Sequence, residues 1–280
     1  MSAAWTVAAA LREAAARLAE SASPRLDVEL LLAHCLTSRR AALFAAPERV
    51  LDDATATRFF ELVAARAGHT PLAYLTGEAE FWSLSFAVTP AVLVPRPETE
   101  LLVEQALAAW PAGRTGQALD LGTGSGAIAA ALASERPALS VFASDRSAAA
   151  LDVARGNFAR LHLVVQVFQG DWLAAVAPAT LDVILANPPY VGANEAVDAA
   201  VLQEPRGAVF ADLDGLAALA AIARDAPRCL RPGGFVALEH GHAQGPAVRD
   251  LLRGAGLGAV ATARDLAGHE RVTTARRVAD

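Results

Sequence analysis

The sequence contains no lysine: all 24 basic residues of the 280-residue chain are arginine. Without lysine the chain cannot form a Schiff base through a side-chain amine, and it cannot use the lysine of a phosphate-binding P-loop. The formal net charge of −6 weighs against a nucleic-acid-binding protein, which needs a basic face to meet the phosphates. We therefore expect no direct nucleic-acid partner.

Cysteine and long apolar runs are also scarce. The two cysteines, Cys35 and Cys229, are far apart in sequence and form neither a disulfide framework nor a metal-ligand cluster. No apolar run approaches the ~20 residues that cross a bilayer, and charges interrupt the alanine-rich N-terminus, which favours an amphipathic helix over a signal peptide. These absences predict a chain without a metal site or a membrane span, working in a reducing cytoplasm.

What is present is a globular composition, 54% hydrophobic and 19% charged, with a change of pattern along the chain. Residues 1–76 show apolar residues at helical spacing, with helix starts near Asp27 and Thr55, and predict a small helical domain that docks the substrate. Alternation in residues 77–96 predicts a hairpin connector. From Pro97, a helix start, residues 97–280 predict the catalytic domain.

In that last region apolar strands alternate with helices, which indicates a parallel sheet covered on both faces. The last two strands are joined by a short loop at Gly268, so we expect the sheet to end in an antiparallel hairpin. The predicted strands are 117–121, 139–145, 164–169, 181–186, 234–239, 258–264 and 271–277, and the predicted helices are 127–135, 147–160, 214–229 and 244–254.

A glycine-rich loop follows the first of these strands. Glycines allow a tight turn and a close approach to a ligand, and Asp120 at the strand end is placed to hold a cationic amino group. The loop also fits the dinucleotide fingerprint through Gly122, Gly124 and Ala127, so a nicotinamide cofactor and a merely structural turn remain as alternatives. The candidate cofactor-binding residues here are Asp120, Gly122, Thr123, Gly124, Ser125 and Gly126.

Two further strand ends carry candidate cofactor-binding residues. Asp145 can accept both hydroxyls of a ribose, or begin the following helix. Asp171 and Trp172 suit an adenine ring, with hydrogen bonds from the acid and packing from the indole, although a turn followed by a core tryptophan fits this segment equally well.

The segment Asn187-Pro188-Pro189-Tyr190 follows the apolar strand LDVILA. The Asn187 side-chain oxygen and the Pro188 carbonyl can each accept one hydrogen of an NH₂ group, and the Tyr190 ring can lie against the planar system that bears it. An ordinary turn is the alternative. We take Asn187, Pro188 and Tyr190 as the candidate catalytic residues, and all four residues of the segment as substrate-binding.

This arrangement suits methyl transfer to an amide or amino nitrogen. Two acceptors on the hydrogens draw electron density toward a poorly nucleophilic nitrogen and orient it, so that positioning and electrostatics supply most of the catalysis. The methylated nitrogen loses its proton easily, so no strong general base is required.

The chain resembles the protein-(glutamine-N5) methyltransferases that act on peptide-chain release factors. The resemblance is carried by PLAYLTGEAEFWSLSFAVTPAVLVPRPETE at 71–100, DLGTGSGAIAAALA at 120–133, GDW at 170–172, NPPY at 187–190, EP at 204–205, EHGHAQG at 239–245 and HERVTTAR at 269–276. It implies the Rossmann-like seven-stranded sheet of class I methyltransferases with a helical N-terminal domain. It also implies S-adenosylmethionine bound by Gly122 to Gly126, Asp145, Trp172 and Asn187, with the substrate glutamine held by Asn187 to Tyr190.

Other functions remain as alternatives. A DNA amino methyltransferase uses the same NPPY chemistry on a flipped base, but the acidic charge counts against it. A non-catalytic adaptor that binds release factor would not need an intact glycine loop and NPPY segment. A nicotinamide oxidoreductase would need a hydride-transfer acid or base, for which the sequence offers no candidate.

Overall fold

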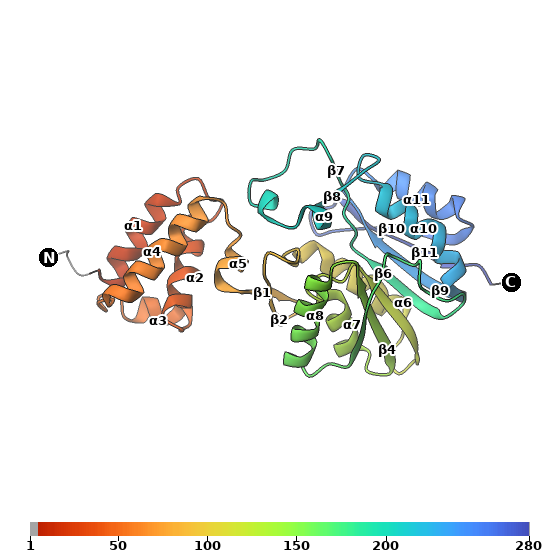
Figure 1. Ribbon diagram of the computed structural model, residues 1–280, viewed down its shortest axis with the longest axis horizontal. Coiled ribbons are helices and arrows are strands. Elements are labelled where there is room, and N and C mark those ends of the chain that lie inside the picture. Colours follow the sequence, from red (N-terminus) through yellow and green to blue (C-terminus); the bar gives the residue numbers. More distant parts are fainter. Residues whose placement is uncertain (1–4, 280) are drawn as a thin grey trace. The chain divides into compact units, whose positions relative to one another are not determined.

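The structure, a computed structural model, describes residues 5–279, which divide into two units. One unit contains the chain up to residue 78 together with 198–203, and the other contains 79–197 and the chain from 204 onward. The first unit is helical (Figure 1), with α1 (Val7–Arg17), α2 (Pro24–Cys35), α3 (Arg40–Ala45), α4 (Asp53–Ala67), α5 (Leu72–Thr76) and the short 3₁₀ turn η2 (Val201–Gln203).

The helical unit has a core of its own, which includes the fully buried Leu31, Phe59 and Val63. Side chains cap the starts of α1 and α4. The carboxylate of Asp52 accepts from the backbone nitrogen of Thr55 at 2.8 Å, so α4 begins two residues before the predicted start. Asp27 lies in the first turn of α2, which begins at Pro24.

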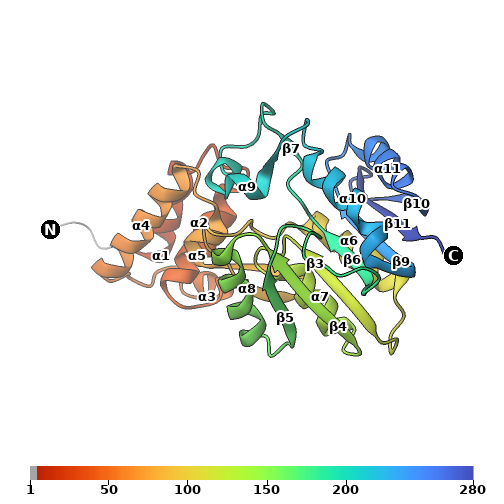
Figure 2. The same ribbon diagram turned by 45° about the vertical axis from the view of Figure 1, so that its right-hand side comes forward.

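The second unit is built on a seven-stranded sheet in the order β10-β11-β9-β6-β3-β4-β5, and Figure 2 shows β5, β4 and β3 at one end of it and β10 and β11 at the other. The pairs among β9, β6, β3, β4 and β5 are parallel, whereas β11 runs antiparallel to both β9 and β10. The strands are β3 (Gly116–Leu121), β4 (Leu139–Asp145), β5 (Val165–Gln169), β6 (Leu181–Ala186), β9 (Leu230–Glu239), β10 (Leu257–Arg264) and β11 (Glu270–Arg277). The predicted fold class, including the terminal antiparallel hairpin, is confirmed.

Helices cover both faces of this sheet because alternate residues of each strand point to opposite sides. Ala118 packs with α6, α7 and α8 on one face, and Leu119 packs with α10 and α11 on the other. The helices are α6 (Glu100–Ala109), which follows the 3₁₀ turn η1 (Pro97–Thr99), and α7 (Ala127–Glu135), α8 (Ala148–Arg160), α10 (Ala217–Cys229) and α11 (Gly245–Gly254).

A two-stranded sheet of β1 (Glu78–Phe81) and β2 (Leu84–Ala87) precedes the large sheet. Its turn residues, Trp82 and Ser83, have φ of 54° and 57°, the left-handed backbone of the tight turns that join twisted strands. The Trp82 backbone nitrogen donates to Glu100 of α6 at 2.7 Å, which fixes the hairpin to the sheet-bearing unit.

The segment between β6 and α10 adds β7 (Val191–Gly192), α9 (Arg206–Val209) and β8 (Phe210–Ala211). Across residues 5–279, every helix is too short or too polar to reach from one side of a bilayer to the other.

Candidate active site

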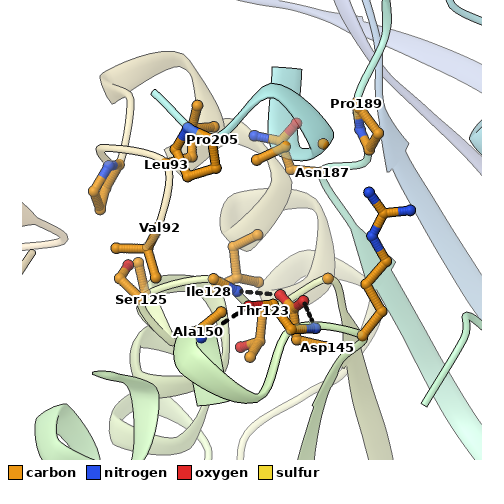
Figure 3. Close-up of a pocket in the computed structure, with 18 of the residues that line it drawn as sticks. Val92, Leu93, Thr123, Ser125, Ile128, Asp145, Ala150, Asn187, Pro189 and Pro205 are labelled. Carbon is orange, nitrogen blue, oxygen red and sulfur yellow. Dashed lines mark hydrogen bonds between the residues drawn. The ribbon is translucent and has the colours of Figure 1, made fainter. Parts of the chain in front are cut away.

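A cavity of about 310 Å³ lies at the carboxyl ends of β3, β4, β5 and β6. Figure 3 shows Asn187 and Pro189 on one side of it, with Thr123, Ser125 and Asp145 on the other and Val92 and Leu93 along the edge. This is the edge of an open parallel sheet where ligands bind, and the volume falls in the range of small-molecule sites.

The glycine loop forms the floor of the cavity between β3 and α7. Gly122, Gly124 and Gly126 have φ of 68°, 54° and 86°, so all three use the left-handed region that favours glycine. A Cβ on Gly126 would lie 2.6 Å from the Phe158 ring, so glycine is also required there by space.

Asp120 lies beneath this loop. Its carboxyl group is buried; Oδ2 accepts from the Thr123 hydroxyl at 2.6 Å and from the Ala129 backbone nitrogen at 3.2 Å. No described residue donates to Oδ1. Burial, more than any other cause, raises the pKa of Asp120 to about 7, and the nearby Asp145 adds to the rise.

Asp145 ends β4 and reaches the cavity. Its Oδ2 accepts from the Gly124 backbone nitrogen at 3.0 Å, and its Oδ1 accepts from that of Ser147 at 2.9 Å. The side-chain cap of α8 is Ser147, which accepts from Ala150. Each carboxylate oxygen has a second lone pair to offer, so Asp145 can bind a pair of ligand hydroxyls while it holds the loop.

Asp171 and Trp172 follow β5 at the cavity wall. Asp171 is exposed, and Trp172 is half-buried with a φ of 44°. The indole lies against the loop, since a Cβ on Gly122 would be 3.2 Å from it. An aromatic face next to an exposed carboxylate can hold a flat, hydrogen-bonding ring.

The Asn187 to Tyr190 segment leaves β6 at the opposite wall. Asn187 Nδ2 donates to the Thr99 hydroxyl at 3.0 Å, and no described residue donates to Asn187 Oδ1 or to the Pro188 carbonyl. The segment therefore has two acceptors without a donor among the described residues, and Asn187, which carries one of them, lines the cavity. Pro189 lines the cavity, whereas the Tyr190 ring packs with the core beneath α10 and α11.

A buried carboxyl group ends the strand next to this segment. Glu239, the last residue of β9, is 1% exposed; its Oε1 accepts from the Tyr190 hydroxyl at 3.4 Å, and no described residue donates to its Oε2. Burial is the main cause that raises the pKa of Glu239 to about 7 and that raises the pKa of the Tyr190 hydroxyl above its usual range. The pairing of Ala186 with Leu238 places Asn187 and Glu239 on neighbouring strand ends.

The structure brings most of the predicted residues together around the cavity, but not all of them line it. Asp120 lies beneath the loop, Gly126 faces Phe158 at the end of the loop, and Pro188 and Tyr190 turn into the protein. The predicted residues that line the cavity are Gly122, Thr123, Gly124, Ser125, Asp145, Asp171, Trp172, Asn187 and Pro189.

Sequence reasoning did not assign several residues that shape the site. The fully buried Asn157 of α8 donates to the Ser125 and Ala87 carbonyls and accepts from the Ala87 nitrogen, which ties the glycine loop to β2. Arg96, at the cavity, pairs with the buried carboxylate of Glu204, which also accepts from the Val94 nitrogen. In the sequence, Glu239 could have been found as a candidate site residue, because it is an acid at the end of the apolar strand FVALE.

Comparison with known protein families matches both parts of the chain. Residues 9–77 match the family described as the PrmC N-terminal domain, and residues 97–205 match the family described as the methyltransferase small domain.

Curated relatives are similar over nearly the whole length. A release factor glutamine methyltransferase of Salmonella typhimurium is 45% identical over 95% of this chain and 97% of its own. The Bordetella pertussis protein of the same name is 47% identical over 91% and 96%, and the Escherichia coli protein is 42% identical over 95% and 97%.

Solved structures share the fold at lower identity. A Pyrococcus furiosus methyltransferase has a TM-score of 0.54 at 21% identity, covering 79% of this chain and 97% of that one. A Thermus thermophilus 16S rRNA methyltransferase, solved with AdoMet and guanosine, has a TM-score of 0.52 at 24% identity, covering 71% and 49%.

Proposed function

The chain belongs to the family of release factor glutamine methyltransferases, and we propose that it transfers a methyl group to the side-chain amide nitrogen (N5) of a glutamine in a peptide-chain release factor. The resemblance found in the sequence is thereby confirmed at the level of the family. The observation that carries the proposal is the side-chain oxygen of Asn187, which lines the cavity without a donor among the described residues and is followed in the chain by the Pro188 carbonyl, also without one.

The cofactor is S-adenosylmethionine, which supplies an electrophilic methyl group on a sulfonium centre. The residues present fit it. Asp145 has lone pairs free for ribose hydroxyls, Trp172 offers a flat apolar face for adenine, and the left-handed glycines leave the loop without side chains in the way.

For Asp120 we propose a different role from the one predicted. Its carboxyl lies under the loop and binds Thr123 and Ala129, so it shapes the loop. The Asp120 carboxyl does not line the cavity, so it does not contact the cationic groups of the cofactor and can attract them only at a distance.

On the substrate side, we propose that Asn187 and Pro188 accept the two hydrogens of the glutamine amide, with Pro189 packing beside it. Two acceptors favour electron density on nitrogen and fix its orientation for an in-line displacement. The ring of Tyr190 was predicted to lie against the substrate amide; we propose instead that Tyr190 supports the segment from within the protein.

The partner we propose is a protein loop and not a nucleic acid, and the compartment is the cytoplasm. A duplex-binding enzyme draws much of its affinity from neutralised phosphates, whereas this chain carries a net charge of −6. A glutamine at an exposed loop tip can reach a cavity edge without unfolding its own domain.

The test is to incubate the protein with S-adenosylmethionine labelled in the methyl group and with purified release factor, and to map the label by mass spectrometry. We expect one methyl group on one glutamine side chain. Duplex DNA serves as the competing substrate, and faster labelling of DNA than of release factor would overturn the substrate assignment while leaving the cofactor in place.

A further inference from the structure

The motif EHGHAQG at 239–245, which ends β9 and leads into α11, has no part in the chemistry above. Its glutamine, Gln244, makes three hydrogen bonds with one side-chain amide. Gln244 Nε2 donates to the carbonyl oxygens of Tyr190 at 3.0 Å and Asp214 at 3.1 Å. Gln244 Oε1 accepts from the Gly241 backbone nitrogen at 2.9 Å. One side chain thus joins the end of the substrate-binding segment, the loop before α10 and the loop after β9.

These partners fix the direction of the Gln244 amide. An amide group has two hydrogens on its nitrogen and only acceptor lone pairs on its oxygen. Two carbonyls face the nitrogen and one N–H faces the oxygen, so a reversed amide would lose all three bonds. Gln244 stands at the N-cap position of α11, but its side chain makes no cap bond to that helix. Its hydrogen bonds therefore serve the three loops and not the start of α11.

The loop before α10 adopts an unfavourable backbone where it meets this amide. Leu213, Asp214 and Gly215 have φ of 55°, 52° and 84°, and the left-handed region costs free energy in residues other than glycine. A Cβ on Gly215 would collide with the Tyr190 carbonyl oxygen and would lie 2.7 Å from Gln244 Nε2. The loop is therefore packed directly onto the bond between Gln244 and Tyr190.

This bond matters because the substrate-binding segment has few backbone hydrogen bonds of its own. Pro188 and Pro189 carry no backbone N–H, and no described residue donates to the Pro188 carbonyl. Among the residues that the structure describes, Gln244 is the one side chain that donates to the backbone of the segment. The segment is thus tied at its start by the bond from Asn187 to Thr99 and at its end by the bond from Gln244.

We propose that Gln244 is a positioning residue, which holds the Tyr190 carbonyl and thereby fixes the backbone of the substrate-binding segment. Asn187 and Pro189 of that segment line the cavity, whereas Gln244 does not. Gln244 therefore acts on the substrate amide only through the segment. The two prolines transmit the restraint, because their rings fix φ and leave the segment few ways to bend. This inference rests on the proposed function and deepens it.

Gln244→Met tests the inference by turnover, because methionine has a similar length and lacks the amide. Once the Tyr190 carbonyl is released, the reacting groups lose their alignment, and kcat on release factor should fall about 10- to 100-fold. KM for release factor should stay the same, since the restraint serves the transition state and not docking. Affinity for S-adenosylmethionine, measured by calorimetry, should also stay unchanged, and the stoichiometry of binding reports the folded fraction.

Thr180→Val is the matched control. The Thr180 hydroxyl donates to the Ala177 carbonyl at 2.9 Å just before β6 begins, so this variant also loses a side-chain bond to a backbone carbonyl, at the opposite end of the strand from Asn187. Its kcat should equal that of the wild type. A merely structural Gln244 would lower the folded fraction and leave the kcat of each folded molecule unchanged. That outcome in Gln244→Met, or an unchanged kcat, would overturn the inference.

A readout without substrate keeps the inference distinct from the proposed function. The chain has two tyrosines, Tyr74 and Tyr190, so protein labelled with ¹³C at the tyrosine carbonyl gives two carbonyl signals in an NMR spectrum. The Tyr190 signal is the one that disappears in Tyr190→Phe. It should shift in Gln244→Met, which removes a hydrogen bond from this carbonyl, and stay in place in Thr180→Val.

A second NMR signal shows whether the restraint reaches the cavity. The side-chain NH₂ signal of Asn187 in ¹⁵N-labelled protein, assigned by its loss in Asn187→Ala, should also shift in Gln244→Met and stay in place in Thr180→Val. If wild type fails to methylate release factor, the substrate proposal falls and these two signals alone decide the role of Gln244. A shift of both retains the inference, and an unmoved Tyr190 or Asn187 signal rejects it.

Discussion

Asn187 is the single side chain on which the proposed chemistry most depends. Asn187→Ala removes one of the two amide acceptors but leaves the backbone between β6 and Pro188 in place. Loss of a positioned hydrogen-bonding group at a reacting centre commonly lowers the rate by ~10²-fold or more, so we expect a fall of that size in kcat.

The measurement is turnover of labelled S-adenosylmethionine on release factor, with the thermal midpoint as the control for folding. The midpoint should stay close to that of the wild type. An Asn187→Ala protein with wild-type kcat would remove this residue from the mechanism.

Asp120 makes a prediction about pH and stability. Its pKa is raised from 3.8 to about 7 in the folded protein, so the folded state favours the protonated carboxyl. The contribution of Asp120 to the free energy of unfolding is therefore largest in acid, and it is lost as the pH rises from 3.8 to about 7.

Asp120→Asn is neutral at every pH and lacks this dependence. Urea unfolding at about pH 5 and about pH 8 should show the wild type losing stability relative to Asp120→Asn at the higher pH. Glu239 titrates alike in both proteins and cancels from the comparison. A difference that does not change with pH would show that Asp120 ionises freely in the fold.

At the scale of elements, the turn from β3 into α7 is the most constrained. Gly126→Ala places a methyl group 2.6 Å from Phe158 and holds a φ of 86° that L residues avoid. We expect a loss of more than about 2 kcal/mol in the free energy of unfolding, since the clash adds to the backbone strain. Weaker cofactor binding should accompany it.

The matched change is Gly124→Ala, which has a φ of 54° with no atom within 4 Å of the added methyl group. It should cost only the backbone strain, about 1 kcal/mol. Chemical denaturation of both variants compares the two effects directly, and equal losses would mean that Phe158 yields to the methyl group.

The elements of the large sheet could be predicted because most of its strands are short apolar runs, and β3, β4, β5, β9 and β10 end at or just before a glycine or an acid. All seven predicted strands are present, and the helix predicted over 127–135 has those bounds in α7. The short β7, α9 and β8 were not predicted, because a strand of two residues or a helix of four has no periodicity to detect.

The sequence predicted which strand ends form the site. It did not predict the direction in which each side chain points. Asp120 and Tyr190 stand in the predicted segments but turn into the protein, toward Thr123 and Glu239. The sequence placed Thr99 in a helix start and Glu239 at a strand end. That Thr99 binds Asn187, and that Glu239 ends the strand next to it, depends on the strand order of the sheet, which local patterns do not contain.

At the scale of the whole molecule, we expect the helical unit to serve the protein substrate and not the cofactor. The buried residues of this unit form a cluster of their own, and the cavity is lined by residues of the other unit alone. Removal of residues 1–70 should therefore lower kcat/KM for intact release factor by at least about tenfold, since a tethered docking contact raises the local concentration of substrate.

Cofactor affinity, measured by calorimetry with S-adenosylmethionine, should be the same in the truncated and the full-length chain. That measurement also reports whether the remaining chain is folded. Normal methylation of release factor by the truncated chain would rule out docking by this unit.

The position of Trp172 against Gly122 has an optical consequence. Of the four tryptophans, Trp172 lines the cavity, whereas Trp5 lies in the helical unit beside Phe60, Trp82 in the hairpin turn and Trp110 in the core. Indole emission responds to a stacked ring, so S-adenosylmethionine should quench the intrinsic fluorescence of the wild type and leave that of Trp172→Phe unchanged. Trp172 is thus an intrinsic fluorescent probe of the cofactor site, and binding can be followed by tryptophan emission without a label or a substrate.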